Sequence, residues 1–163
     1  MKKRSPKQPV QQSNPIVRTV IVGFISSSVM TVVMHLLHSR LPRDEQYPLP
    51  PEEIATVTEM KVLGKPLNPS SHMAFTLASH FGYGITLAGI YSIVAKSWPF
   101  APFVKGVLYG MGVWAGSYLG WLPALRILRP ATEFPPARNW LMIISHIVWG
   151  ATLGILTHKF REQ

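Results

Sequence analysis

Four long apolar runs separated by polar connectors constrain the fold of this chain more than any other feature. The runs cover about residues 16–38, 72–97, 104–128 and 139–158. Each can form a helix of about 20 to 25 residues, which is the length that crosses a hydrocarbon core of about 30 Å. Only 14% of the 163 residues are charged, and most of these lie in the connectors. The sequence therefore predicts an all-α integral membrane protein in which four transmembrane helices form a bundle.

The second and fourth runs contain nearly the same sequence. Residues 79–87 read SHFGYGITL and residues 145–153 read SHIVWGATL, so Ser, His, Gly, Thr and Leu recur in the same order. A proline pair also follows the first run, at Pro50-Pro51, and the third run, at Pro135-Pro136. We interpret the chain as two repeated transmembrane hairpins that are related by an axis along the membrane normal.

The segments outside the runs predict the orientation in the membrane. Residues 1–15 carry four Lys and Arg side chains among prolines and are expected to form a disordered basic tail, followed by an uncleaved signal anchor. This basic cluster precedes the first run, so the N-terminus and the tail at residues 159–163 are predicted to be cytoplasmic. The net charge is +9, but the basic residues flank apolar runs, which favours the lipid bilayer as partner and argues against nucleic acid.

The first connector holds most of the carboxylates and a helical pattern of its own. Prolines and glutamates at residues 50–53 favour a helix start, and Ile54, Val57, Met60 and Leu63 follow at near-helical spacing before Gly64. A short amphipathic helix is therefore predicted over about 51–63, on the membrane surface.

The sequence contains none of the common catalytic patterns. No Asp or Glu lies inside an apolar run, no HExxH, GxSxG or phosphate-binding glycine loop is present, and there is no cysteine. Ser79 and Ser145 adjoin histidines, but neighbours in sequence do not face each other on a helix. We expect a protein without enzymatic activity.

Histidines are the unusual polar groups of the runs. In the predicted topology His80 and His146 lie at similar depth in the outer half of the bilayer, where two imidazoles can meet across a bundle. Gly84 and Gly150 each follow one of them by four residues and either clear room for a ligand or let helices touch. The candidates for a cavity or ligand site are His80, His146, Gly84, Gly150, His35, His38 and His72.

Four interpretations of these histidines stay open. Two imidazoles at one depth can ligate haem b. His80 and His146, or a soft face of Met30, Met34 and His38, can hold copper. The histidines can also titrate, since imidazole ionises near about pH 6.5. Finally, each can simply hydrogen-bond a neighbouring helix, in which case no cofactor is present.

Glycines and arginines mark two further features. The third run is expected to pack closely against neighbouring helices, including those of a homodimer or other membrane subunits, through Gly106, Gly110, Gly112, Gly116 and Gly120. Three cations beside the predicted outer mouth either bind an anionic headgroup or substrate anion, or anchor the helices at the interface: Arg126, Arg129 and Arg138.

These motifs also resemble a known family. His80 with Gly84 and Gly89, the sequence Leu-Pro-Ala-Leu at residues 122–125, the pair at 135–136, and His146 with Gly150 and Gly154 are similar to the YagU-like family of small bacterial inner-membrane proteins. The resemblance covers about residues 16–158. It implies a four-helix inner-membrane protein of unassigned activity and supplies no catalytic residues.

Three functions are compatible with the sequence. The first is a non-enzymatic membrane protein of envelope maintenance or of the response to acid or other stress, acting through a histidine-lined outer cavity. The second is a haem or copper protein in electron transfer or metal handling. The third is a small transporter or channel subunit.

Overall fold

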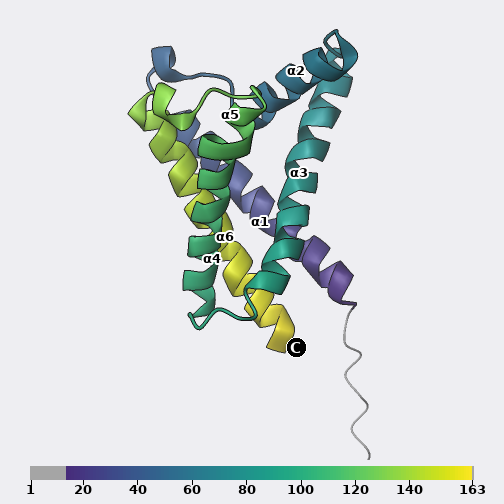
Figure 1. Cartoon of the computed structure of the whole chain (residues 1–163), viewed down its shortest axis with the longest axis vertical. Helices are drawn as coiled ribbons and strands as arrows, with labels where there is room; N and C mark the ends of the chain where they lie inside the picture. The colour runs from purple at the N-terminus through teal and green to yellow at the C-terminus, as the bar shows by residue number, and fades with distance from the viewer. Residues whose placement is uncertain (1–13, 163) are drawn as a thin grey trace, which may run out of the picture.

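A computed structural model describes residues 14–162, and every regular element in this part of the chain is helical (Figure 1). The elements are α1 (Pro15–His38), a 3-10 turn (Arg43–Glu45), α2 (Pro50–Leu63), α3 (Pro69–Val94), α4 (Pro102–Ala115), a π-helix (Gly116–Trp121), α5 (Leu122–Ala124), a second 3-10 turn (Ala131–Glu133) and α6 (Pro136–Glu162). The prediction of an all-α protein is confirmed. The predicted disordered tail lies largely outside the described residues.

Local sequence explains where the long helices begin. α1, α2, α3 and α4 each have a proline in the first turn, where its missing N–H costs no hydrogen bond. The side chain of Asn14 accepts a hydrogen bond from the Ile16 backbone N–H at 2.9 Å, and Asn68 caps α3 through the Ser71 N–H in the same way. Proline and asparagine therefore define the helix starts.

Three helices are long and apolar enough to cross a membrane, namely α1, α3 and α6. α1 begins one residue before the predicted run, and α3 lies about three residues nearer the N-terminus than the predicted 72–97. α6 continues to Glu162, so most of the segment predicted as a tail, residues 159–163, is helical. These helices support a multi-pass membrane protein.

The third apolar run, predicted as one helix over 104–128, is interrupted. α4 ends at Ala115, the π-helix follows, and inside it Gly120 has φ −112° and ψ −107°, outside the helical region. Pro123 lacks an N–H and removes one helical hydrogen bond just beyond this point. α4 and the π-helix nevertheless return from the end where α3 finishes towards the end where α6 begins (Figure 1). A bundle of four spanning helices and a repeat of two hairpins stay predictions.

Glycines bring the helices into backbone contact at two interfaces. A Cβ added to Gly106 or Gly110 of α4 would collide with a carbonyl oxygen of α6. A Cβ added to Gly150 or Gly154 of α6 would collide with a carbonyl oxygen of α4. In the α1 and α3 pair, a Cβ on Gly23 would lie 2.8 Å from the Ile85 Cα. Gly112 and Gly116 face open space, so only part of the glycine series serves the packing of α4 on α6.

The ends of the described chain meet at one end of the molecule. The Arg18 guanidinium in α1 donates a hydrogen bond to the Phe160 carbonyl in α6 at 2.6 Å. α2 and α5 lie at the opposite end (Figure 1). α1 and α6 therefore start or finish on the same side, and the connectors 39–68 and 125–135 lie on the other.

Candidate functional site

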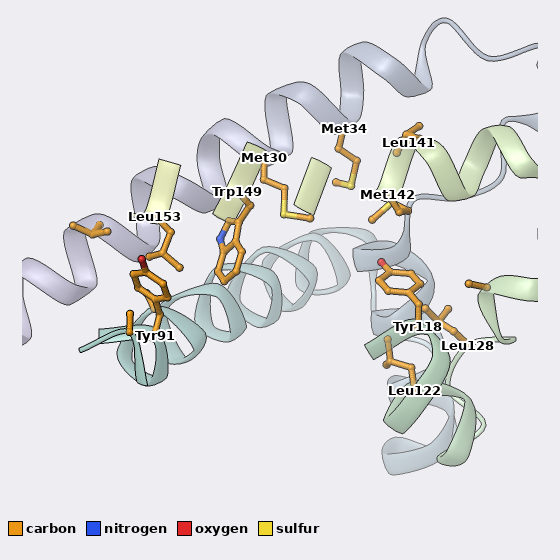
Figure 2. Packing of buried hydrophobic residues seen from close by; sticks show 14 residues of the cluster. Met30, Met34, Tyr91, Tyr118, Leu122, Leu128, Leu141, Met142, Trp149 and Leu153 are labelled. Carbon is orange, nitrogen blue, oxygen red and sulfur yellow. The ribbon is translucent and has the colours of Figure 1, made fainter. Parts of the chain in front are cut away.

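A cavity of about 240 Å³ lies among the helices, and residues of α2 help to line it. Its walls come from α1, α3, α6 and the segment formed by α4, the π-helix and α5. Both repeat histidines line it, His80 from α3 and His146 from α6. The other walls are largely apolar and aromatic, as Figure 2 shows for Met30, Trp149 and Tyr118.

His80 is held by a hydrogen-bond chain to α1. Its Nε2 lies 2.9 Å from the Thr31 Oγ1, and the Thr31 hydroxyl donates to the Ser27 carbonyl at 2.8 Å. Since the hydroxyl has one hydrogen and the carbonyl can only accept, Thr31 accepts its bond from the His80 Nε2–H. The His80 Nε2 therefore carries a hydrogen, and when the ring is neutral the lone pair is on Nδ1.

His146 is held by its own helix. Its Nδ1 lies 2.8 Å from the Met142 carbonyl oxygen, so Nδ1 carries the hydrogen and Nε2 carries the lone pair when the ring is neutral. The Tyr118 ring meets the imidazole edge to face, with 5.7 Å between centroids and an interplanar angle of 87°. No bond from residues 14–162 is found to the His146 Nε2 or the His80 Nδ1. Each histidine thus keeps one acceptor nitrogen.

Three of the histidines singled out in the sequence lie outside the cavity lining. His38 hydrogen-bonds the Tyr47 carbonyl at 2.8 Å, and His35 is exposed. His72 pairs with the buried carboxylate of Glu59 at 2.8 Å. His38 and His72 therefore hold the connectors in place, and the structure brings together only two of the five predicted histidines.

The two repeat glycines serve helix contact. Gly84 lines the cavity, yet a Cβ there would collide with the Ser27 hydroxyl of α1. Gly150 is not part of the lining and faces Gly106 of α4. Of the two interpretations given for these glycines, close helix packing is the one their surroundings favour.

The set of soft metal ligands that the structure brings together differs from the predicted set. Met30 and Met34 line the cavity with His80 and His146, while His38 does not, and Met142 joins them from α6 (Figure 2). Within residues 14–162 no cluster of three or more His, Asp or Glu suits a metal ion. The cavity of about 240 Å³ is smaller than the pockets of about 300 Å³ or more that hold drug-sized ligands, and haem binding stays a prediction.

Several lining residues were not selected from the sequence. The Tyr83 hydroxyl lies 3.1 Å from the Ser117 Oγ, a bond that joins α3 to the π-helix, and the Tyr83 ring lies 6.0 Å from the Trp121 ring. Tyr83 and Trp149 occupy equivalent positions in the repeat, three residues after each histidine, and both line the cavity. This shared aromatic position was the signal in the sequence that marked them.

The three predicted anion-binding arginines have different surroundings. The Arg138 guanidinium donates to the Glu53 carboxylate of α2 at 2.6 Å and lies 3.8 Å from the Phe134 ring centroid. It is buried, and the ion pair holds α2 beside the cavity. Arg126 and Arg129 are exposed. Anion binding stays a prediction that only these two exposed guanidinium groups support.

Helices suited to crossing a membrane, with a cavity among them, define a candidate multi-pass membrane protein. The chain belongs to a family described as "Protein of unknown function (DUF1440)", whose model matches residues 24–155. This agrees with the predicted membership of a family without an assigned activity. No curated protein and no solved structure matches the chain.

Proposed function

We propose that this protein is a non-enzymatic, multi-pass membrane protein that binds a small, mostly apolar molecule carrying a hydrogen-bond donor. One observation carries the proposal: His80 and His146 line the same cavity, and each uses its N–H inside the protein. The two remaining ring nitrogens can only accept hydrogen bonds. A ligand that supplies one O–H or N–H would satisfy one of them, and an amine with two hydrogens could satisfy both.

The size and lining of the cavity suit a ring-sized ligand. An engineered apolar cavity of about 150 Å³ is known to bind benzene, and this cavity measures about 240 Å³. Tyr118, Trp121 and Trp149 offer aromatic surface. The proposed ligand is therefore a single ring with short substituents, or a molecule of similar volume, bearing one hydroxyl or amine.

We further propose four membrane crossings built from two duplicated hairpins. α4 and the π-helix together span Pro102–Trp121, twenty residues, and an α-helix of that length extends about 30 Å. The repeat positions also behave alike: His80 and His146 both line the cavity, and Gly84 and Gly150 both lie in a close helix contact. We place both termini in the cytoplasm of a bacterial cell and assign the protein to envelope maintenance or to the response to acid or other stress.

The test uses phenol and toluene as probes, because they have nearly the same size and differ in one hydroxyl. We expect the purified protein in detergent to bind phenol more tightly than toluene, measured by calorimetry or by the shift in unfolding temperature. His80→Leu and His146→Leu remove the acceptor nitrogens at similar volume and leave no buried donor unpaired. The variant that removes the nitrogen accepting the phenol O–H should weaken phenol binding about tenfold, and both variants should leave toluene binding unchanged.

His35→Leu is the matched control, since His35 is exposed and lies outside the lining. It should bind both probes like the wild type. Equal affinity of the wild type for phenol and toluene, together with unchanged phenol affinity in both cavity variants, would refute the proposal.

A second candidate is Cu(I) binding, favoured by the three methionines and two histidines that line one cavity. Thioether sulfur and neutral imidazole nitrogen are ligands that Cu(I) accepts. In a competition assay against a chromogenic Cu(I) chelator, one copper per chain is expected. Met30→Leu and Met142→Leu should lower the affinity, and Met73→Leu, on an exposed surface, should not. A protein that retains no stoichiometric copper would eliminate this candidate and leave the first one standing.

A further inference from the structure

A second cavity, of about 190 Å³, lies between α1, α3 and α6 at the end of the molecule where both ends of the described chain meet. Three cations from separate parts of the fold line it: Arg18 of α1, Lys96 just after α3, and Arg161 of α6. Among the described residues, ten line this cavity and none of them is Asp or Glu. The described part of the wall therefore concentrates positive charge without a carboxylate.

Hydrogen bonds between helices hold the two guanidinium groups at this cavity. Arg18 donates to the Phe160 carbonyl and Arg161 donates to the Ser92 carbonyl, both at 2.6 Å. These carbonyls belong to the last turns of α6 and α3, where helical partners are missing and the helix dipole is negative. The bonds therefore prevent the arginines from extending away from the bundle, and they fix three helices around the cations.

Lys96 favours an anion site, because helix capping alone does not account for this residue. Its side chain is exposed and makes no hydrogen bond or ion pair with residues 14–162. A lysine that caps no carbonyl and stands at a cavity with two arginines adds charge that no described group compensates. An anion that enters the cavity would compensate the Lys96 charge.

We propose that this cavity binds a phosphate group, as a phosphate monoester or diester anion. Arginine forks and the lysine ammonium are the usual ligands of phosphate oxygens, and Thr19 and Thr157 add hydroxyl groups to the lining. Val22 and Ala88 form an apolar wall on the bundle side. Basic pockets between membrane helices commonly bind anionic lipid headgroups, so the phosphate of an anionic phospholipid is one source and a free phosphate is the other.

The experiment follows thermal unfolding of the full chain in a maltoside detergent, which contains no phosphate. Phosphatidylglycerol, diacylglycerol and inorganic phosphate are titrated separately. We expect phosphatidylglycerol to stabilise the wild type and diacylglycerol to have no effect. Lys96→Gln should weaken the phosphatidylglycerol effect about fivefold, the value for one cation near an anionic headgroup. Lys65→Gln, which removes an exposed cation from the connector between α2 and α3, should leave the effect unchanged.

Each outcome decides the proposal. Stabilisation by inorganic phosphate alone, weakened in Lys96→Gln, supports the site and identifies a soluble phosphate as its ligand. No stabilisation by either phosphate source, or an equal loss in Lys96→Gln and Lys65→Gln, overturns it. Arg161→Gln should weaken binding further, but it also removes the bond to Ser92. Lys96→Gln disturbs no helix contact, so a folded protein is available for the test.

Discussion

The helix pair α1 and α3 and the helix pair α4 and α6 both pack through small residues, but these residues contact different kinds of atoms. Both place small residues four positions apart where the helices touch. In the second pair, four glycines each face a backbone carbonyl oxygen of the other helix, namely Gly106, Gly110, Gly150 and Gly154. In the first pair, Gly23 faces the Ile85 Cα. Gly84, however, faces the Ser27 hydroxyl, a side-chain atom that can rotate. The α1 and α3 contact can therefore adjust at Gly84, whereas all four glycines of the α4 and α6 contact face backbone.

The two repeat histidines show the same contrast. His80 depends on Thr31 of the neighbouring helix α1, while His146 uses the Met142 carbonyl of its own helix. Moving α1 relative to α3 would change the His80 environment, and moving α4 relative to α6 would leave the His146 bond intact. The His80 bond therefore depends on the contact between α1 and α3, whereas the His146 bond does not depend on the contact between α4 and α6.

Gly150→Ala should have the largest effect on stability. The new methyl group would collide with the Gly106 carbonyl, and the backbone cannot rotate away, so α4 and α6 must separate. We expect a loss of about 3 kcal/mol in the free energy of unfolding, measured by titration with sodium dodecyl sulfate in mixed micelles. A loss below about 0.5 kcal/mol, the range of a surface change, would mean that this pair is as adjustable as the other.

Thr31→Val should have the next largest effect and should act on one histidine only. It removes the acceptor of the His80 Nε2–H, which leaves a partly buried donor unpaired and costs about 1.5 kcal/mol. Nitrogen NMR of labelled histidine should show a change at His80, while His146 keeps its signal because its bond lies within α6. A change at both rings would contradict the independence of the two pairs.

Gly84→Ala should destabilise by about 1 kcal/mol, less than Gly150→Ala, because the Ser27 side chain can move. Adding Ser27→Ala removes the hydroxyl that collides, so the double variant should recover most of the lost stability in the same titration. No recovery would show that the strain lies in the backbone of α1.

Gly112→Ala should have the smallest effect. Nothing lies within 4 Å of the position where its Cβ would be, and alanine favours helix over glycine, so a gain of about 0.5 kcal/mol is expected. The oligomeric state is measured in parallel by light scattering in detergent. A loss of stability together with a loss of dimer would place this face of α4 against a second copy of the chain, as the glycine series predicted.

Much of the fold was predictable because it depends on local chemistry. The run at 16–38 becomes α1 at Pro15–His38, and the helix expected over 51–63 becomes α2 at Pro50–Leu63. The interruption of the third run was missed, although Gly120 and Pro123 were both visible. Neither residue alone ends a membrane helix, since neighbouring helices can satisfy the freed backbone groups.

The site was predictable in part. The matched depth of His80 and His146 pointed to one layer, and both line one cavity. Grouping His38 with Met30 and Met34 was not supported, because the chain turns after α1 and the His38 ring bonds the Tyr47 carbonyl. The ion pair of Arg138 with Glu53 joins residues 85 positions apart, and no local pattern indicates such a partner.

The sequence by itself determined which segments are helical and apolar enough to enter a membrane, since run length, proline and asparagine act within a few residues of each other. The tertiary structure decided which side chains share a cavity. The three long helices α1, α3 and α6 are apolar along most of their length, so composition alone does not set their rotation. The contacts at Gly84 and Gly150 set the rotation of the helices, because helix backbones can approach this closely in only a few orientations. In the orientation that the structure adopts, His80 and His146 line one cavity.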